Sequence, residues 1–323
     1  MHRIILCRAL PEAGMAVFAG RSDLDVVTLT PPAETDLARL APDASAILAW
    51  VERIGPELFL AAPRLRVISR LGVGFDTVDL TAATARGVPV MVVNGTNDLT
   101  VAEHAMALML GCARQFALVD ADVRGGTWQA TGFRRTVDLA GRRVLVVGFG
   151  RIGVRVARLC AAFGMRVAVY DPLYPPPRIA ADGFIPETDL HRALARADVV
   201  TLHCPLKPET RHLMNGAAFA ALKPGAMLIN TARGGVVEEP ALIAALRSGH
   251  LAAAGLDVLE TEPPARDNPL LTMPNVILSP HSAGSTDECM DRMAMQAARN
   301  ILDALDGRPD PAMVVNAEVL GGT

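Results

Sequence analysis

A glycine-rich turn between an expected strand and an expected helix is the first feature that could support chemistry. The strand Arg143–Gly148 leads into Gly148-Phe149-Gly150-Arg151-Ile152-Gly153, and a helix over Val154–Phe163 follows. In this context the spacing is typical of dinucleotide binding: the first glycine permits the turn, the second lets backbone approach a pyrophosphate, and the third lets helix and strand pack closely. Phosphates would then bind the N–H groups at the start of the helix. An ordinary strand–helix turn is the alternative.

An acidic residue follows at the spacing that a nucleotide site requires. Asp171 ends the next expected strand, eighteen residues after Gly153. A carboxylate there accepts hydrogen bonds from the adenosine ribose and repels a 2′-phosphate, so it predicts NAD rather than NADP. Arg178 lies nearby and could bind such a phosphate, which keeps NADP open as an alternative.

Polar residues also gather after three later strands, in the segments Asn230–Gly235, Gly255–Pro264 and Ser279–Gly284. Doubly wound sheets bind their ligands outside the carboxyl ends of the strands. We therefore expect these segments and the glycine loop at one edge of a single sheet.

The elements that must position these residues alternate between strand and helix along the whole chain. This alternation predicts an α/β fold with two doubly wound parallel-sheet domains, a Rossmann NAD-binding domain and a smaller, flavodoxin-like substrate domain. A helix over Asp98–Phe116 separates the two series of strands, and a last helix covers about Thr286–Leu305. The expected strands are Arg3–Cys7, Asp25–Leu29, Ala46–Trp50, Val67–Arg70 and Val90–Val93, and then Arg143–Gly148, Arg166–Asp171, Val199–Cys204, Met227–Thr231, Ala253–Val258 and Val276–Ser279.

Composition bounds the class of protein. The 323 residues are 51% hydrophobic and 20% charged, which suits two well-packed domains. The net charge of −3, without a basic stripe, argues against a nucleic-acid partner. The longest apolar run, Ala105–Ala113, is about half of the ~20 residues that a membrane span needs, and the N-terminus lacks a signal-peptide pattern. Five widely spaced cysteines and scattered histidines predict no metal site and a cytoplasmic protein.

Taken together, these segments resemble the D-isomer-specific 2-hydroxyacid dehydrogenases, which include phosphoglycerate dehydrogenases and glyoxylate/hydroxypyruvate reductases. The resemblance runs through Val101-Ala102-Glu103-His104, the glycine loop, His203-Cys204-Pro205, Thr210 and the three polar segments, and so covers nearly the whole chain. It implies an NAD-dependent oxidoreductase that acts on the CH–OH group of a small 2-hydroxy acid, or reduces the matching 2-oxo acid. Glyoxylate, hydroxypyruvate and phosphohydroxypyruvate represent the substrate class.

The resemblance also implies a catalytic trio of Arg233, Glu262 and His281. Arg233 would bind the substrate carboxylate with a planar two-pronged donor. His281 would give a proton to the carbonyl oxygen, because imidazole titrates near neutral pH. Glu262 would pair with His281, orient the ring and favour its protonated form. The family pattern places the acid immediately before proline, which selects Glu262 and leaves Glu260 as a solvated residue.

Cofactor contacts follow from the same resemblance. Asp257 would meet the nicotinamide end of the cofactor rather than act as a base. The implied cofactor-binding residues are Val101, Gly148, Gly150, Arg151, Ile152, Gly153, Asp171, His203, Cys204, Pro205, Thr210, Thr231, Ala232, Arg233, Asp257, His281, Ala283 and Gly284.

On the substrate side, the resemblance points to the loop after the fourth strand. Leu71, Gly72, Val73 and Gly74 would bind the substrate carboxylate through backbone N–H groups, together with Arg233 and His281. Arg70 could bind a substrate phosphate, although a structural salt-bridging arginine is the favoured alternative.

Domain organisation and assembly are implied as well. The last helix would return to the first domain, so that residues 1–97 plus 285–323 form the substrate domain and residues 98–284 the NAD-binding domain. The active site would lie in the cleft between them, and we expect no regulatory C-terminal domain of the kind that some phosphoglycerate dehydrogenases carry. The Asp98–Phe116 helix would contribute to a homodimer interface or, alternatively, to the intrachain core.

Two other functions compete with the 2-oxoacid reductase. Formate dehydrogenase-like relatives carry glutamine where Glu262 stands, so the acid argues against them. An NADH-binding corepressor of the same fold would keep the trio, and only a missing interaction tail argues against it.

Overall fold

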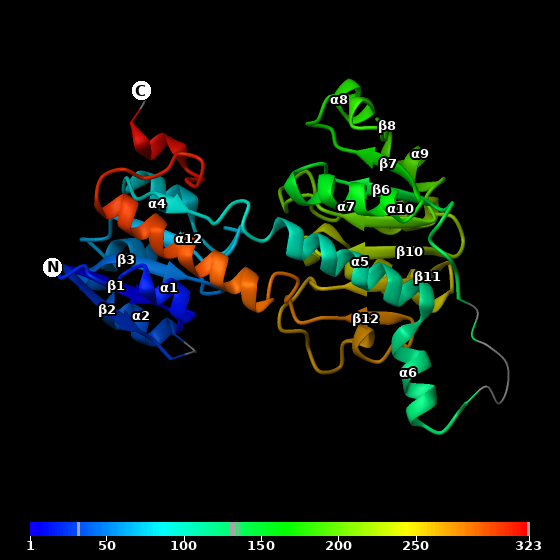
Figure 1. Ribbon diagram of the computed structural model, residues 1–323, viewed down its shortest axis with the longest axis horizontal. Helices are drawn as coiled ribbons and strands as arrows, with labels where there is room; N and C mark the ends of the chain where they lie inside the picture. The colour runs from blue at the N-terminus through cyan, green and yellow to red at the C-terminus, as the bar shows by residue number, and fades with distance from the viewer. Residues whose placement is uncertain (31–32, 129–133, 135, 322–323) are drawn as a thin grey trace. The chain divides into compact units, whose positions relative to one another are not determined.

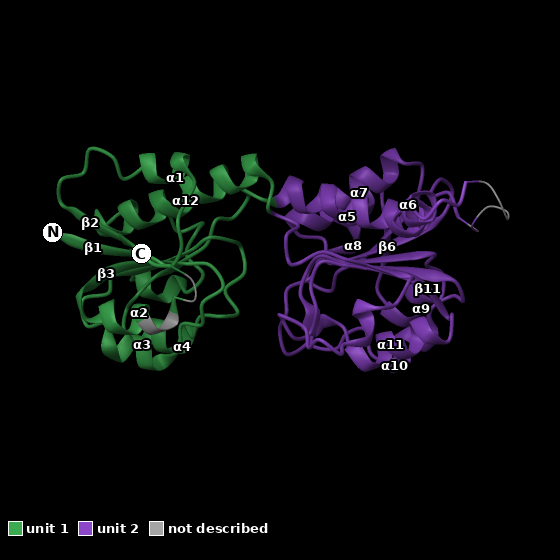
Figure 2. Ribbon diagram, turned by 90° about the horizontal axis from the view of Figure 1, so that it is seen from below, with its two compact units in different colours: residues 1–97, 285–323 green, residues 98–284 purple. Residues whose placement is uncertain are grey.

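The computed structural model describes residues 1–30, 33–128, 134 and 136–321 (Figure 1). The chain folds into two compact units, each a parallel sheet between two layers of helices (Figure 2). Unit 1 consists of Met1–Asn97 and Ser285–Thr323, and unit 2 of Asp98–Gly284. The two-domain α/β prediction is therefore confirmed.

Unit 1 has a five-stranded parallel sheet in the order β2-β1-β3-β4-β5, which is the flavodoxin-like order. Its strands are β1 (His2–Leu6), β2 (Leu24–Thr28), β3 (Ala44–Ala49), β4 (Val67–Arg70) and β5 (Val90–Met91). Helices α1 (Glu12–Ala16) and α12 (Asp287–Leu305) cover one face, and α2 (Glu34–Leu40), α3 (Pro56–Ala61) and α4 (Leu80–Ala85) the other (Figure 2).

The C-terminal helix α12 joins unit 1 because its apolar residues recur at helical spacing. Cys289, Met293, Ala297 and Ile301 are all buried on the sheet. Two buried polar contacts fix the helix in place: the Ser69 hydroxyl donates to the Ala297 carbonyl at 2.9 Å, and the Asn300 amide to the Val92 carbonyl at 3.0 Å. Residues that are distant in sequence thus complete one core.

Unit 2 has a seven-stranded parallel sheet in the order β12-β11-β10-β9-β6-β7-β8. The six-strand prediction missed β8, a three-residue edge strand that contains Pro186. Such a strand is too short for an apolar pattern, and proline is tolerated because the strand lies at the edge. The strands are β6 (Arg143–Val147), β7 (Arg166–Tyr170), β8 (Ile185–Glu187), β9 (Val199–Leu202), β10 (Ala226–Asn230), β11 (Leu251–Leu256) and β12 (Val276–Leu278).

Helices cover both faces of the unit 2 sheet as well (Figure 2). Those of one face include α5 (Asp98–Arg114) and α7 (Arg151–Ala162), and those of the other α9 (Leu190–Leu194), α10 (Gly216–Ala221) and α11 (Glu239–Arg247). The short helix α8 (Pro176–Ala181) precedes β8.

The prediction of one helix over Asp98–Phe116 was wrong at its end. Gln115 adopts a left-handed backbone (φ 50°) that stops α5, and a new helix, α6 (Phe116–Arg124), follows. Most of α5 is buried against α7 and the sheet, so the intrachain-core alternative holds for this helix. No residue of α6 is buried within the chain.

Candidate active site

The glycine loop follows β6, beside the start of the segment after β9, where the strand order of the sheet reverses. Gly148 has φ +93°, and a Cβ there would approach the Cys204 nitrogen to 2.7 Å. A Cβ at Gly153 would overlap the Gly148 carbonyl. Around Gly150, in contrast, a Cβ would meet no described atom within 4 Å. Two glycines are thus required by packing, and the middle one leaves space beside the backbone.

Helix α7 begins directly after this space. Gly150 is its N-cap residue and offers no side chain, so Arg151 and Ile152 start the helix without a side-chain cap. Backbone N–H groups at such an end attract anions, and the helix dipole adds to the attraction. The open space beside Gly150 and the uncapped start of α7 together fit the pyrophosphate of a dinucleotide.

Asp171 lies beside the glycine loop, as its spacing predicts. Its carboxylate accepts hydrogen bonds from the Phe149 nitrogen at 2.7 Å and from the Leu173 nitrogen at 2.8 Å. The side chain is therefore fixed at the end of β7, next to the loop that would hold the phosphates.

The segment after β9 closes the other side of the loop. The Thr201 hydroxyl and His203 Nε2 lie 2.8 Å apart, and burial lowers the pKa of His203 to about 3. Burial raises the pKa of the Cys204 thiol to about 11. The Thr210 hydroxyl donates to the Pro205 carbonyl at 2.6 Å and accepts the Lys207 N–H at 2.8 Å. An internally bonded segment whose His203 and Cys204 are neutral suits a cofactor-lining role.

A buried hydroxyl without a partner gives a separate sign of a ligand. Thr231 follows β10 and is 8% exposed, and its Oγ1 has no hydrogen-bond partner among the described residues. Such a group costs free energy unless something else bonds to it. The unpartnered Thr231 hydroxyl and the open space beside Gly150 are both what a bound dinucleotide would require of these residues.

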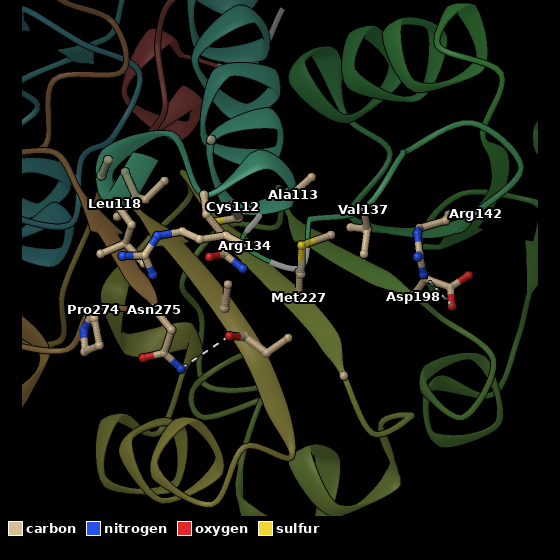
Figure 3. Close-up of a pocket in the computed structure, with 17 residues that line it drawn as sticks. Cys112, Ala113, Leu118, Arg134, Val137, Arg142, Asp198, Met227, Pro274 and Asn275 are labelled. Carbon is tan, nitrogen blue, oxygen red and sulfur yellow. Dashed lines mark hydrogen bonds and ion pairs between the residues drawn. The ribbon is translucent and has the colours of Figure 1, made fainter. Parts of the chain in front are cut away.

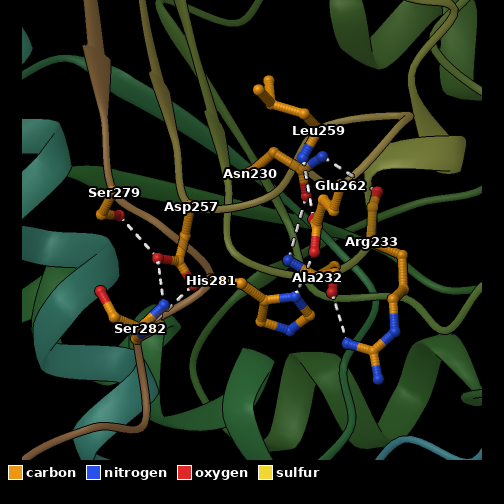
Figure 4. A network of polar contacts seen from close by, with 10 residues as sticks. Asn230, Ala232, Arg233, Asp257, Leu259, Glu262, Ser279, His281 and Ser282 are labelled. Carbon is orange, nitrogen blue, oxygen red and sulfur yellow. Dashed lines mark hydrogen bonds and ion pairs between the residues drawn. The ribbon is translucent and has the colours of Figure 1, made fainter. Parts of the chain in front are cut away.

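Arg233 stands in the turn after β10, and its neighbours fix that turn. The Asn230 amide donates to the Arg233 carbonyl at 3.0 Å and accepts the Ala232 N–H at 3.0 Å (Figure 4). One Arg233 nitrogen donates to the Ala232 carbonyl at 2.7 Å. The guanidinium is half-buried, and its positive charge acts on Glu262.

Glu262 and His281 form a hydrogen-bonded pair, as predicted. The Nδ1 atom of His281 and a carboxylate oxygen of Glu262 lie 2.6 Å apart, and the other oxygen accepts the Leu259 N–H at 3.0 Å (Figure 4). Burial raises the pKa of Glu262, but the hydrogen bond and charge of His281, the Leu259 N–H and the Arg233 charge together bring that pKa below its usual value. His281 Nε2 has no hydrogen-bond partner within the described part of the chain. An imidazole held at Nδ1 by a carboxylate can exchange a proton at Nε2.

Asp257 holds the turn that carries His281. It is 2% exposed, and its carboxylate accepts the Ser279 hydroxyl at 2.6 Å, the Ser282 N–H at 2.8 Å and the Ala283 N–H at 3.0 Å. His104 of α5 extends this network, with Nε2 2.8 Å from the Ser279 hydroxyl. The sequence alone assigns neither His104 nor Ser279 a role, although both lie in motifs that carry the family resemblance.

The prediction that Glu260 is solvated was wrong. Its carboxylate lies 2.6 Å from His212 Nε2, and the side chain is 26% exposed. Sequence spacing missed this pair because Glu260 and His212 lie 48 residues apart.

Unit 1 carries the expected substrate loop at the end of β4. Arg70 is 7% exposed, and its Nε donates to the Gly74 carbonyl at 3.1 Å. The Val93 N–H bonds to the Gly72 carbonyl at 3.1 Å, which ties the loop to the end of β5.

One cavity of about 240 Å³ lies at the opposite ends of the unit 2 strands from this chemistry (Figure 3). Asp198, Met227, Ala253 and Ile277 line it from the starts of β9 to β12. No cluster of three or more His, Cys, Asp or Glu side chains that could hold a metal occurs among the described residues. Nor does any helix in those residues have the length and apolar character required to cross a bilayer.

Comparison with known proteins decides the family. Residues 106–283 match the family model described as D-isomer specific 2-hydroxyacid dehydrogenase, NAD binding domain. The glyoxylate reductase of Korarchaeum cryptofilum is 36% identical over 328 residues, which cover 98% of this chain and 97% of that relative. This chain belongs to the D-isomer specific 2-hydroxyacid dehydrogenase family.

Two other members of the family are informative. The D-3-phosphoglycerate dehydrogenase of Mycobacterium leprae is 44% identical over 295 residues, but the match covers 89% of this chain and only 55% of that protein. The chain thus spans about half the length of this relative. A crystal structure of the NADPH-dependent glyoxylate/hydroxypyruvate reductase of Sinorhizobium meliloti, in complex with NADP and malonate, matches with a TM-score of 0.85 and 29% identity, covering 98% of this chain and 97% of that one.

The remaining predicted residues lie in unit 2 as follows. Val101 is buried in the first turns of α5, and Ala283 and Gly284 follow the Asp257-bound turn. Their cofactor contacts stay a prediction. Among the relatives compared, enzyme names give no support to the corepressor alternative.

Proposed function

We propose that this protein is an NAD-dependent D-2-hydroxyacid dehydrogenase that reduces a small 2-oxo acid of the glyoxylate, hydroxypyruvate or phosphohydroxypyruvate class. The observation that carries the proposal is the Glu262–His281 pair at 2.6 Å, under the charge of Arg233. Reduction of a 2-oxo acid needs a cation to bind the substrate carboxylate and a donor to protonate the carbonyl oxygen. Arg233 would supply the cation, and His281 the proton.

In the proposed reaction, Arg233 binds the substrate carboxylate through two parallel N–H donors. The glycine loop Gly148–Gly153 would hold the cofactor, which when bound would supply the hydride for the carbonyl carbon. His281 gives its Nε2 proton to the carbonyl oxygen, so the products are the 2-hydroxy acid and the oxidised cofactor. Glu262 stabilises the protonated ring before the transfer, and in the oxidising direction the same pair takes the hydroxyl proton.

The proposed cofactor is NAD rather than NADP. Asp171 is held beside the glycine loop by two backbone N–H groups, which fixes a negative charge where a 2′-phosphate would approach. Arg178 contacts the ring of Tyr174, with 5.1 Å between guanidinium and ring centre, and this contact competes with phosphate binding. A relative named as NADPH-dependent makes the discrimination worth measuring.

We assign unit 1 to the substrate and unit 2 to the cofactor. In unit 1, the backbone of Leu71–Gly74 would bind the substrate carboxylate. The bond from Arg70 to Gly74 supports a structural role for this arginine, because it shapes the loop it stands in.

We also propose a cytoplasmic homodimer. All five cysteines are unbridged and buried, which suits a reducing compartment. Phe116, Val119 and Val123 of α6 are 39–57% exposed and offer apolar surface to a second copy. Light scattering at several concentrations measures the oligomeric state, and a strict monomer contradicts this part.

The experiment that tests the activity follows NADH absorbance with glyoxylate, hydroxypyruvate and phosphohydroxypyruvate in turn. Consumption of NADH with one of them is the expected result. No turnover with any 2-oxo acid, together with tight NADH binding, contradicts the proposed reaction and favours a binding protein.

A further inference from the structure

Unit 2 contains a second glutamate–histidine pair, and its glutamate lies close in sequence to Glu262 of the proposed catalytic trio. Glu260 stands two residues before Glu262, and its partner His212 lies in the segment after β9. We propose that His212 is a positioning residue, which holds the turn of Arg233 and the loop of Glu262 at a fixed separation. The inference rests on the proposed function, since it concerns how those two residues are held.

His212 bonds to both segments at once. Its backbone N–H donates to the Gly235 carbonyl at 2.9 Å, two residues after Arg233. Its Nε2 lies 2.6 Å from Glu260 Oε1 and donates to it, because an ionised carboxylate can only accept. One residue therefore connects the two chain segments that carry the proposed carboxylate-binding and acid-orienting groups.

The two segments also touch each other directly. A Cβ at Gly234 would overlap the Leu259 carbonyl and lie 2.5 Å from the Glu260 nitrogen. The Leu259 N–H in turn bonds to Glu262 at 3.0 Å. A shift of the Glu260 backbone would therefore move both the turn beside Arg233 and the N–H that fixes Glu262.

Helix α11 anchors the far side of Glu260. The Glu239 N–H, at the first residue of α11, donates to Glu260 Oε2 at 3.3 Å, and the Glu260 N–H donates to Glu239 Oε2 at 3.2 Å. The Asn268 amide holds the other Glu239 oxygen at 2.7 Å. The N–H of the first residue of α11 and the His212 ring thus hold the two oxygens of the Glu260 carboxylate from different sides. His212 is thus the one ring donor in the described part of a network that otherwise joins two acids through backbone N–H groups and an amide.

The backbone of His212 allows the hydrogen bond to be tested apart from the fold. Its φ of +51° lies in the left-handed region, where asparagine is tolerated better than most residues. His212→Asn therefore keeps the backbone preference, but its side chain is too short to place a donor where Nε2 stands. His212→Gln places an amide donor near the Nε2 position and so restores the bond to Glu260.

The test compares wild type, His212→Asn and His212→Gln in steady-state reduction of a 2-oxo acid, with NADH affinity measured by fluorescence. We expect His212→Asn to lower kcat/KM for the 2-oxo acid by about 10- to 100-fold, as misplacement of reacting groups does. Its Kd for NADH should stay within about twofold of wild type, because no contact of the glycine loop or Asp171 changes. His212→Gln should recover most of the lost activity.

Three results overturn the inference: kcat/KM unchanged in His212→Asn, an equal loss in both variants, or a parallel loss of NADH binding. If His212→Asn does not fold, Glu260→Ala tests the same bond, because it removes the oxygen that accepts the His212 Nε2–H. An inactive wild type refutes the proposed function instead. In that case the inference is tested by NMR on a sample with isotope-labelled histidine. The chemical shifts of the His281 ring should change in His212→Asn and return to the wild-type values in His212→Gln. Chemical shifts that do not change in His212→Asn overturn the inference.

Discussion

The Glu262–His281 and Glu260–His212 pairs share their local geometry and differ in their neighbours. Both have a separation of 2.6 Å, and both histidines have left-handed backbones, with φ of +52° and +51°. Glu260 is bonded further to Glu239 at the start of α11, whereas Glu262 takes only a local N–H and the field of Arg233. The bonded nitrogen differs between the two rings. His281 is held at Nδ1, which leaves Nε2 for the proposed substrate, whereas His212 is held at Nε2, as its proposed positioning role requires.

The largest effect that sharpens this comparison should come from His281→Ala. Loss of a general acid lowers turnover by about 10²- to 10⁴-fold, more than we expect for any His212 variant. NADH binding should be unchanged when measured by fluorescence. His191→Ala, at an exposed histidine of α9, is the control and should keep full activity. Full turnover in His281→Ala would show that His281 is not the general acid, and the proposed functional difference between the two pairs would be wrong.

Arg233→Lys should produce the next largest effect. The lysine keeps the charge but loses the planar two-pronged donor, and a charge-assisted hydrogen bond is worth about 1.5–3 kcal/mol. We expect kcat/KM for the 2-oxo acid to fall by about 10- to 100-fold, mainly through a higher KM. The exposed Arg192→Lys on α9 serves as control. An unchanged KM would place carboxylate binding elsewhere.

Asp171→Ala tests the cofactor side and should have a smaller effect on catalysis. Removing the carboxylate should weaken NADH binding by about tenfold and should weaken NADPH binding less, since repulsion of the 2′-phosphate is also lost. The ratio of the two Kd values is the measurement. A ratio equal to that of wild type shows that Asp171 does not discriminate between the cofactors.

The smallest expected effect is a pH dependence of stability at Glu262. Because its pKa lies below the usual 4.5, the unfolded chain binds more protons than the folded protein near that pH. The pair therefore stabilises the fold fully above pH 4.5, and this contribution is lost as the pH falls through the lowered pKa. Measured by urea unfolding, the free energy of unfolding of Glu262→Gln should be lower than that of wild type at pH 7, and the difference between the two proteins should be smaller at pH 4.

Glu209→Gln, at an exposed glutamate, is the matched control for that experiment and should show no such change of gap with pH. If the difference in free energy of unfolding between wild type and Glu262→Gln is the same at both pH values, the lowered pKa of Glu262 does not contribute to stability.

Much of the fold could be predicted because it rests on local patterns. Apolar runs such as Val144–Val147 locate buried strands, and the glycine loop marks the turn that follows one of them. The edge strand β8 and the break at Gln115 were missed, since a three-residue strand and one left-handed residue leave no periodic signal. Glu262 and His281 were paired in advance through the family pattern rather than through spacing alone.

The role of Glu260 could not be predicted, because it depends on contacts between segments that are distant in the chain. His212 and Glu239 meet Glu260 because β9, β10 and β11 lie side by side in the sheet. Two identical acids two residues apart therefore look equivalent in the sequence and become different in the folded chain.

The most direct test of the central claim is the stereochemistry and stoichiometry of the reduction. Purified protein is incubated with NADH and hydroxypyruvate, NADH loss is followed by absorbance, and the enantiomers of the product are separated by chiral chromatography. Our account predicts one D-2-hydroxy acid formed for each NADH consumed. Formation of the L-enantiomer, or NADH loss without a hydroxy acid product, would contradict it.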